Sequence, residues 1–200
     1  MLKTLFIIVL AMAAVVAGLA YRLVHEGFSA RAQPSAFEAS IAGTVRGWAL
    51  PARYRPMANP VACSDQAVAE GRAHWADHCA TCHANNGSGD TMFGRGMYPK
   101  PPDMRQAQTQ RQSDGELYYT IKNGVRLSGM PAFGDTGDQD TDTWKLVCFV
   151  RRLPRLSFKE AQQMKKMNPK TPDDLEEERL EEQFLNGGAA PAPEGHHHHQ

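Results

Sequence analysis

Cys79-Ala80-Thr81-Cys82-His83 is the stretch that decides the fold of this 200-residue chain. Cys-x-x-Cys-His is the signature of covalent haem attachment. Two thiols three positions apart lie on one helical turn, so each can add to a vinyl group of the same porphyrin. The histidine that follows is then placed to bind the iron as its proximal axial ligand. The pentapeptide therefore predicts one covalently bound haem c, held by Cys79, Cys82 and His83.

Two other interpretations of the paired cysteines are a thioredoxin-like dithiol and half of a zinc site. A dithiol motif should follow a buried strand in a βαβ pattern, and the sequence shows no such pattern. A zinc site needs two further ligands at similar spacing. The other two cysteines, Cys63 and Cys148, stand alone. Haem attachment is therefore the favoured prediction.

The composition indicates a small globular core with long irregular connections. The chain has 42% hydrophobic residues, 17 Gly and 13 Pro. Its 22 basic residues balance 22 acidic ones, so nothing in the charge predicts a nucleic-acid partner. Haem is attached to cysteines after export, in an oxidising compartment, so we expect an export signal at the N-terminus.

An apolar run covers residues 5–20, with Lys3 ahead of it. Sixteen helical residues extend about 24 Å, and the flank up to Val24 brings the segment to membrane-spanning length. The alternative is a signal peptide cleaved after the small-x-small sequence Gly18-Leu19-Ala20. We expect residues 1–24 to be an uncleaved signal anchor, with Lys3 on the cytoplasmic side and the rest of the chain outside.

Residues 25–62 contain several prolines, lack helical periodicity and are predicted to be a linker. Trp48, Leu50 and Tyr54 are apolar enough for part of it to pack on the domain or on a partner. Its basic side chains (Arg46, Arg53 and Arg55) either contact lipid head groups or are simply solvated. After the linker we expect a haem domain over residues 63–154, peripheral helices over 155–186 and a flexible tail over 187–200.

Local signals predict where the helices begin. Ser64 can cap a helix that runs to about residue 78, and residues 84–112 are loop-like. Ser113-x-x-Glu116 is a capping box, and Asn123-Gly124 ends the helix that it opens. A buried helix is expected over residues 143–153, and two shorter ones after Ser157-x-x-Glu160 and Thr171-Pro172-x-Asp174.

The histidines 196–199 are read as a tag remnant or as a natural metal-binding tail.

The sixth iron ligand is predicted to be Met130. An electron-transfer haem needs a second strong ligand, and methionine or histidine has this role in cytochromes c. In Gly129-Met130-Pro131 the glycine lets the backbone approach the macrocycle, and the proline stiffens the loop. The other methionines that closely follow the attachment site are read as lining of the haem pocket (Met92, Met97 and Met104).

Residues 63–154 resemble a class I c-type cytochrome of the small bacterial mono-haem type. The resemblance rests on the helix that enters Cys79 to His83, on Ile121-Lys-Asn-Gly124, on Gly129-Met-Pro-Ala-Phe133 and on the last helix with Trp144. It implies an all-α cytochrome c fold, in which helices and long loops surround one haem, behind an N-terminal transmembrane or signal helix. It also implies that the first and last helices cross near Gly71 or Trp75. Finally, it implies that a loop carbonyl, from Pro99, Pro101 or Pro102, accepts the ring N–H of His83.

Cys63 and Cys148 depart from the pattern of that family. Each could be a small buried hydrophobic residue. In an oxidising compartment two spare thiols could also be paired. A bridge with this sequence separation stabilises a protein by about 4 to 5 kcal/mol on the loop-entropy model. The sequence leaves both alternatives open.

These observations predict an electron carrier rather than an enzyme. The chain would be tethered on the extracytoplasmic face of the membrane, with His83 and Met130 as axial ligands and redox proteins as donor and acceptor. One alternative is the haem subunit of a larger membrane oxidoreductase. Another is a haem sensor or peroxidase with an open sixth site, which requires that Met130 not bind the iron. The acidic run from Asp135 to Asp142 is read as a solvated loop, or as a surface that steers a basic partner.

Overall fold

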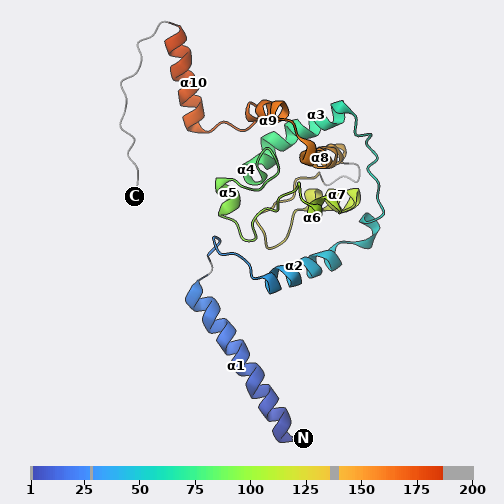
Figure 1. Cartoon of the computed structure of the whole chain (residues 1–200), viewed down its shortest axis with the longest axis vertical. Coiled ribbons are helices and arrows are strands. Elements are labelled where there is room, and N and C mark those ends of the chain that lie inside the picture. The colour runs from blue at the N-terminus through green and yellow to red at the C-terminus, as the bar shows by residue number, and fades with distance from the viewer. Residues whose placement is uncertain (1, 28, 136–139, 187–200) are drawn as a thin grey trace.

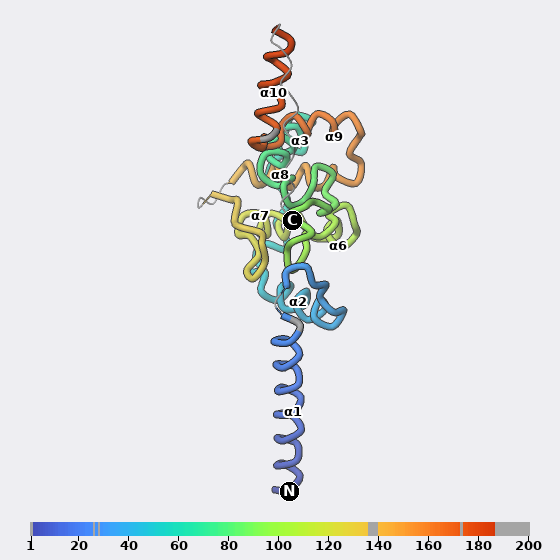
Figure 2. Tube along the Cα trace, turned by 90° about the vertical axis from the view of Figure 1, so that its left-hand side faces the viewer, coloured from blue at the N-terminus to red at the C-terminus, as the bar shows by residue number. Residues whose placement is uncertain are grey.

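Helices make up all the regular secondary structure of residues 2–27, 29–135 and 140–186, which are the residues that the computed structural model describes. No strand occurs in these ranges, so the predicted all-α fold is confirmed for them. Figure 1 shows a helical body with α1 extending from one side and α10 from the other. Figure 2, turned by 90°, places the same two helices at opposite ends of the long axis.

The body is organised around the crossing of α3 (Asp65–His74) and α8 (Thr141–Arg152). Ser64 caps α3 by accepting a hydrogen bond from the backbone N–H of Ala67, as its position predicts. The helices meet where Gly71 lies against the backbone of Lys145 and Leu146. Because glycine has no side chain, the two backbones approach closely at this point. The predicted crossing is therefore confirmed.

A disulfide joins Cys63, just before α3, to Cys148 within α8, with a Cα–Cα distance of 5.3 Å. Asn59 adds a second connection, since its side-chain amide donates a 3.0 Å hydrogen bond to the carbonyl of Trp144. The alternative in which these two cysteines are separate buried residues is excluded. The segment before α3 is thus fastened to α8.

The helix α7 (Asp114–Asn123) begins with the predicted capping box of Ser113 and Glu116. Its apolar stripe of Leu117, Tyr118 and Ile121 is buried, and Tyr118 stacks on Trp144 of α8 at 4.1 Å between ring centroids. The short 3₁₀ helix η1 (Ala52–Tyr54) also packs against α7. There Tyr54 lies 4.8 Å from Tyr119, so part of the predicted linker packs on the domain.

The long connection between His83 and Ser113 contains only two short helices among its described residues, α5 (Met92–Arg95) and α6 (Ala107–Gln110). Arg151 of α8 fastens the end of this connection. Its guanidinium donates to the carbonyls of Gln110 and Gln112 and to the Asp114 carboxylate. The predicted loop is therefore irregular but held by α8.

After α8 the chain continues through the 3₁₀ turn η3 (Leu153–Arg155) into α9 (Phe158–Lys165) and α10 (Pro172–Leu185). Both helices begin where the sequence predicts, and each start has a capping box, at Ser157 and at Thr171. Met164 of α9 is fully buried in the same hydrophobic core as α7 and α8. The helix α9 thus forms part of the body, whereas α10 stands away from it (Figure 1).

The N-terminal segment forms two helices, α1 (Leu2–Glu26) and α2 (Ala36–Ala49). The stretch Leu2–His25 is long and apolar enough to cross a membrane and is not buried against the rest of the structure. The expectation that residues 25–62 lack a helix was wrong. Ser35 caps α2 by accepting from the backbone N–H of Glu38, and this Ser-x-x-Glu signal was hidden among the neighbouring prolines.

Candidate functional site

The attachment pentapeptide lies where α3 turns into a π-helical segment, η2 (Trp75–Cys79), and then into α4 (Ala80–His83). The indole Nε1–H of Trp75 donates a 3.0 Å hydrogen bond to the carbonyl of Ala84, directly after the pentapeptide. The Trp75 ring also lies 5.5 Å from the imidazole of His83. Trp75 therefore fixes the C-terminal end of the pentapeptide, a role that its predicted place on the apolar face of the helix did not reveal.

Neither thiol of the pentapeptide is in a disulfide; Cys79 is buried and Cys82 half-buried. Burial raises the pKa of the Cys79 thiol to about 12 and also raises the pKa of Cys82. Redox-active dithiols need the opposite shift, because the thiolate is the reacting species. The part of the chain that the structure describes also holds no group of three metal-binding side chains. The dithiol and zinc interpretations therefore gain no support.

An apolar cavity lies beside the pentapeptide, between α4, α7, α8 and the loop that carries Met130. Cys79, His83 and Met130 all line it, whereas Cys82 on the same helical turn does not. The rest of its lining is apolar (Trp75, Met104, Ile121, Phe133 and Leu146). The structure thus brings three of the four predicted site residues to one enclosed space.

His83 is buried, and burial lowers the pKa of its imidazole to about 4. The ring is therefore neutral at physiological pH and keeps a lone pair for a metal. Its Nδ1 is buried without a hydrogen-bond partner among the described residues. The expected bond to a carbonyl of Pro99, Pro101 or Pro102 is thus absent here, and the carbonyl oxygen of Pro101 lies against Gly89 instead.

The loop that carries Met130 is fastened to the end of α7. The backbone N–H groups of Phe133 and Gly134 donate to the carbonyls of Ile121 and Lys122, which the helix end leaves free. Gly124 follows with φ +66°, and a Cβ there would lie 2.7 Å from the carbonyl oxygen of Met130. A residue with a side chain would push this loop away. The Asn-Gly helix end and the methionine loop are thus one structural unit.

The three methionines that were predicted to line the haem pocket, Met92, Met97 and Met104, lie in different surroundings. Met104 lines the cavity, as predicted. Met97 lies under Gly129, with its sulfur 2.9 Å from the position that a Cβ of Gly129 would take. Met92 is 73% exposed, so the expectation that it lines the pocket was wrong. Met92 is exposed because it lies at the start of the short surface helix α5, although it closely follows His83 in the sequence.

The residues around the cavity fit a covalently attached haem. Two unpaired thiols flank one helical turn, a neutral histidine is buried beside them, and the adjoining cavity is apolar. The burial of the His83 ring beside the two thiols leaves it facing this apolar space rather than water. Cys79 and Cys82 would hold the porphyrin, and the apolar side chains would exclude water from it.

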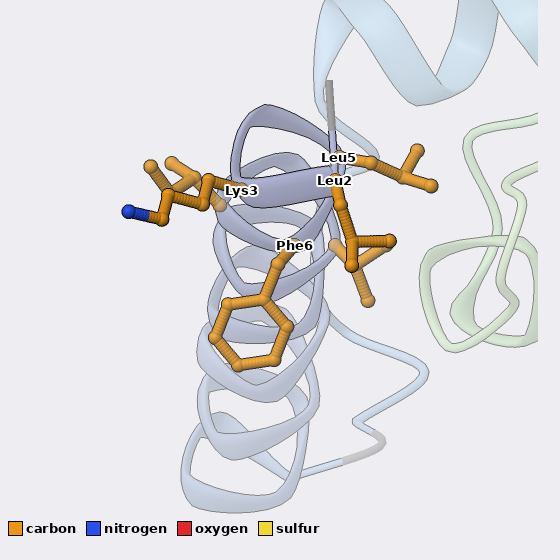
Figure 3. Close-up of a pocket in the computed structure, with 6 residues that line it drawn as sticks. Leu2, Lys3, Leu5 and Phe6 are labelled. Atoms are coloured by element: carbon orange, nitrogen blue, oxygen red, sulfur yellow. The ribbon is translucent and has the colours of Figure 1, made fainter.

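Two other features lie outside this site. A shallow apolar hollow on α1 is lined by Leu2, Lys3, Leu5 and Phe6, and Figure 3 shows their side chains spreading outward from a single helix. It is therefore the surface of the apolar helix and not a binding pocket.

Within the acidic run, Asp140 is buried and caps α8 by accepting from the backbone N–H of Thr143. Neither predicted role of the run applies to Asp140, and residues 136–139 lie outside the described ranges.

In a comparison with known protein families, residues 66–150 match the family "Cytochrome C oxidase, cbb3-type, subunit III". This match covers fewer than half of the 200 residues and coincides with the helical body around the cavity. No curated protein gives a significant match to the chain. Residues 66–150 form a c-type cytochrome domain, and such a domain carries covalently bound haem c and serves electron transfer.

Proposed function

We propose that this c-type cytochrome domain is a mono-haem electron carrier in which His83 and Met130 are the two axial ligands and Cys79 and Cys82 hold the porphyrin. The observation that carries the proposal is that His83 and Met130 line one apolar cavity although 47 positions separate their numbers in the chain. A thioether ligand blocks the iron to small molecules and raises its potential, which suits electron transfer rather than substrate activation.

Haem c, when bound, supplies a one-electron iron couple. The chain's own residues set the conditions for it. Burial keeps the His83 imidazole neutral, and Trp75 packs against its ring. The hydrogen bonds from Phe133 and Gly134 to α7 hold the methionine loop in place, so that little reorganisation accompanies electron transfer.

We propose further that α1 remains in the membrane and that the domain lies on its extracytoplasmic side. The helix extends about 37 Å at 1.5 Å per residue, enough to span the hydrocarbon core. The Cys63–Cys148 disulfide supports an oxidising compartment for the domain. Lys3 at the start of α1 supports an N-terminus on the cytoplasmic side. Redox proteins would then deliver and accept electrons at that face of the membrane.

A second candidate function is that of the haem subunit of a larger membrane oxidoreductase. The match of residues 66–150 to an oxidase subunit family favours it. The two candidates differ in the size of the particle that carries the haem. After mild detergent extraction, a free carrier should elute as a small species, whereas a subunit should elute with the other chains of its complex.

Optical spectra of the haem-loaded protein and of its Met130→Ala variant test the ligand set. In the oxidised wild type we expect a weak absorption band at long wavelength from the thioether-to-iron bond, and the variant should lack it. Carbon monoxide should leave the reduced wild type unchanged and should bind the variant. If wild type binds carbon monoxide readily and the variant has the same spectrum, Met130 is not a ligand. The haem sensor or peroxidase with an open sixth site would then be the better interpretation.

A further inference from the structure

The helix α2 carries an apolar stripe that the described part of the chain leaves uncovered. Residues at spacings of four, four and three lie on one face of an α-helix. In α2 these positions hold large apolar side chains, and each is mostly or about half exposed (Phe37 76%, Ile41 48%, Val45 52% and Trp48 79%). The opposite face holds small residues, among them Ala39 and Gly43. Outside α1, no other described helix has four exposed large apolar residues.

The haem domain nevertheless holds α2 at both of its ends. The phenolic O–H of Tyr98 donates to the carboxylate of Glu38 in the first turn. Near the last turn, Arg55 donates a 2.7 Å hydrogen bond to the carbonyl of Gly47 and lies 3.9 Å from Glu116 of α7. Every residue of α2 is exposed, so the domain fixes the position of the helix without covering its stripe.

The same helix is close to the end of the membrane-spanning segment. The connection from Glu26 to Ala36 comprises nine residues and can extend at most about 36 Å. A turn shortens it, because the backbone N–H of Ala32 donates to the carbonyl of Ser29. In Figures 1 and 2, α2 lies crosswise near the C-terminal end of α1, between that end and the haem domain. This is the level of the lipid head groups if α1 spans the bilayer.

We propose that α2 is an interfacial helix whose stripe of Phe37, Ile41, Val45 and Trp48 enters the head-group and acyl-chain boundary of the outer leaflet. An amphipathic helix that follows a membrane span is partnered most directly by the lipid surface that the span already occupies. Tryptophan favours this boundary because its ring is apolar and its N–H is polar. With α2 held by Tyr98 and Arg55, the lipid surface fixes the height and the orientation of the haem domain. This inference rests on the proposed membrane anchor.

The test measures the surroundings of Trp48 in the full-length, haem-loaded protein. The protein is placed in vesicles of phosphatidylcholine and phosphatidylglycerol with brominated acyl chains, which quench tryptophan by contact. The emission of Trp48 is obtained as the difference between wild type and Trp48→Phe, because Trp75 and Trp144 are buried. We expect the brominated lipid to remove most of this emission and acrylamide in the water to remove little of it. The Ile41→Glu variant should lose the lipid quenching, and Ala39→Glu on the opposite face should keep it.

Two outcomes overturn the proposal while the anchor stands. In the first, acrylamide quenches Trp48 and brominated lipid does not, so the stripe lies in water. In the second, Trp48 is open to acrylamide in vesicles but shielded in native membranes, so another protein subunit covers it. The anchor is tested separately by alkaline extraction of native membranes and by the intact mass of the extracted protein. Release from the membrane together with a mass that lacks residues 1–20 overturns the anchor and this inference together.

Discussion

Gly71 of α3 and Lys145 of α8 approach so closely that a Cβ on Gly71 would lie 2.2 Å from the Lys145 carbonyl oxygen. The obstructing atom belongs to the backbone and cannot move aside like the end of a flexible side chain. The distance between the two central helices is thus set by the absence of one methyl group.

The Gly71→Ala variant should therefore be less stable than wild type. Overpacking at a fixed helix crossing costs about 1 to 3 kcal/mol, and this exceeds the helix propensity of about 1 kcal/mol gained by alanine. Urea unfolding followed by circular dichroism measures the difference. Gly43→Ala in α2 is the matched control, since nothing lies within 4 Å of its Cβ position, and it should not be destabilised. Equal stability of Gly71→Ala and wild type would contradict the close crossing.

The capping boxes show how much of the fold is encoded locally. Ser113, Ser157 and Thr171 each open a helix where the sequence predicts one, because a capping box needs only residues within one turn. The crossing at Gly71 was predicted from a family resemblance, and the structure supplies its physical cause. Burial of Met164 was not predicted, since one apolar residue in a polar helix reveals nothing until a neighbouring helix covers it.

The candidate site was predicted almost entirely from two short motifs. The pentapeptide and the Gly-Met-Pro sequence identified Cys79, His83 and Met130, and the structure places these three around one cavity. Met104 and Leu146, which also line it, come from segments whose proximity to each other depends on the tertiary fold. The capping role of Asp140 was not predicted. The acidic run contains several aspartates, and the sequence alone does not show which of them is buried.

Removing the disulfide tests the fastening of the segment before α3. The double variant Cys63→Ala, Cys148→Ala should unfold at a lower urea concentration, with a loss of at most about 4 to 5 kcal/mol, because the unfolded chain regains the entropy of an 85-residue loop. The optical spectrum of the folded variant should match that of wild type, since neither residue lines the cavity. An unchanged unfolding midpoint would show that the bridge contributes nothing to stability.

The buried cap Asp140 provides a third prediction. Its carboxylate accepts from the backbone N–H groups of Thr143 and Asp135 and from the hydroxyl of Thr143. Asp140→Ala should therefore destabilise the protein by about 1 to 2 kcal/mol through loss of the helix cap. Asp135→Ala is the control, because that side chain is exposed and only its backbone N–H takes part. Thermal unfolding of both variants gives the comparison, and equal shifts would refute a specific role for Asp140.

Gly124 provides a test of the methionine loop that leaves Met130 itself intact. A methyl group at position 124 would lie 2.6 Å from the carbonyl carbon of Pro131, and its φ of +66° disfavours alanine. Gly124→Ala should displace the loop, weaken the proposed Met130 ligation and let carbon monoxide bind the reduced protein. Gly96→Ala is the control. A Cβ at position 96 would make only ordinary contacts, 3.5 Å or longer, so the reduced form of this variant should not bind carbon monoxide. Stopped-flow mixing with carbon monoxide compares the two variants.

The pairing of Cys63 with Cys148 has a consequence for how this protein matures. Four cysteines allow three complete sets of pairs, and only one of these sets could contain the Cys63–Cys148 bridge. In an oxidising compartment the thiolate of a lone Cys63 can attack the disulfide of an oxidising protein and form a mixed disulfide with it. The half-buried Cys82 can then attack that mixed disulfide and release the oxidant's thiol, which pairs Cys63 with Cys82 and blocks the Cys82 sulfur. Closing the long-range bridge removes both competing thiols and leaves Cys79 and Cys82 for the proposed attachment of the porphyrin. A variant with only one of the two bridge cysteines should therefore yield less haem-loaded protein than a variant with neither.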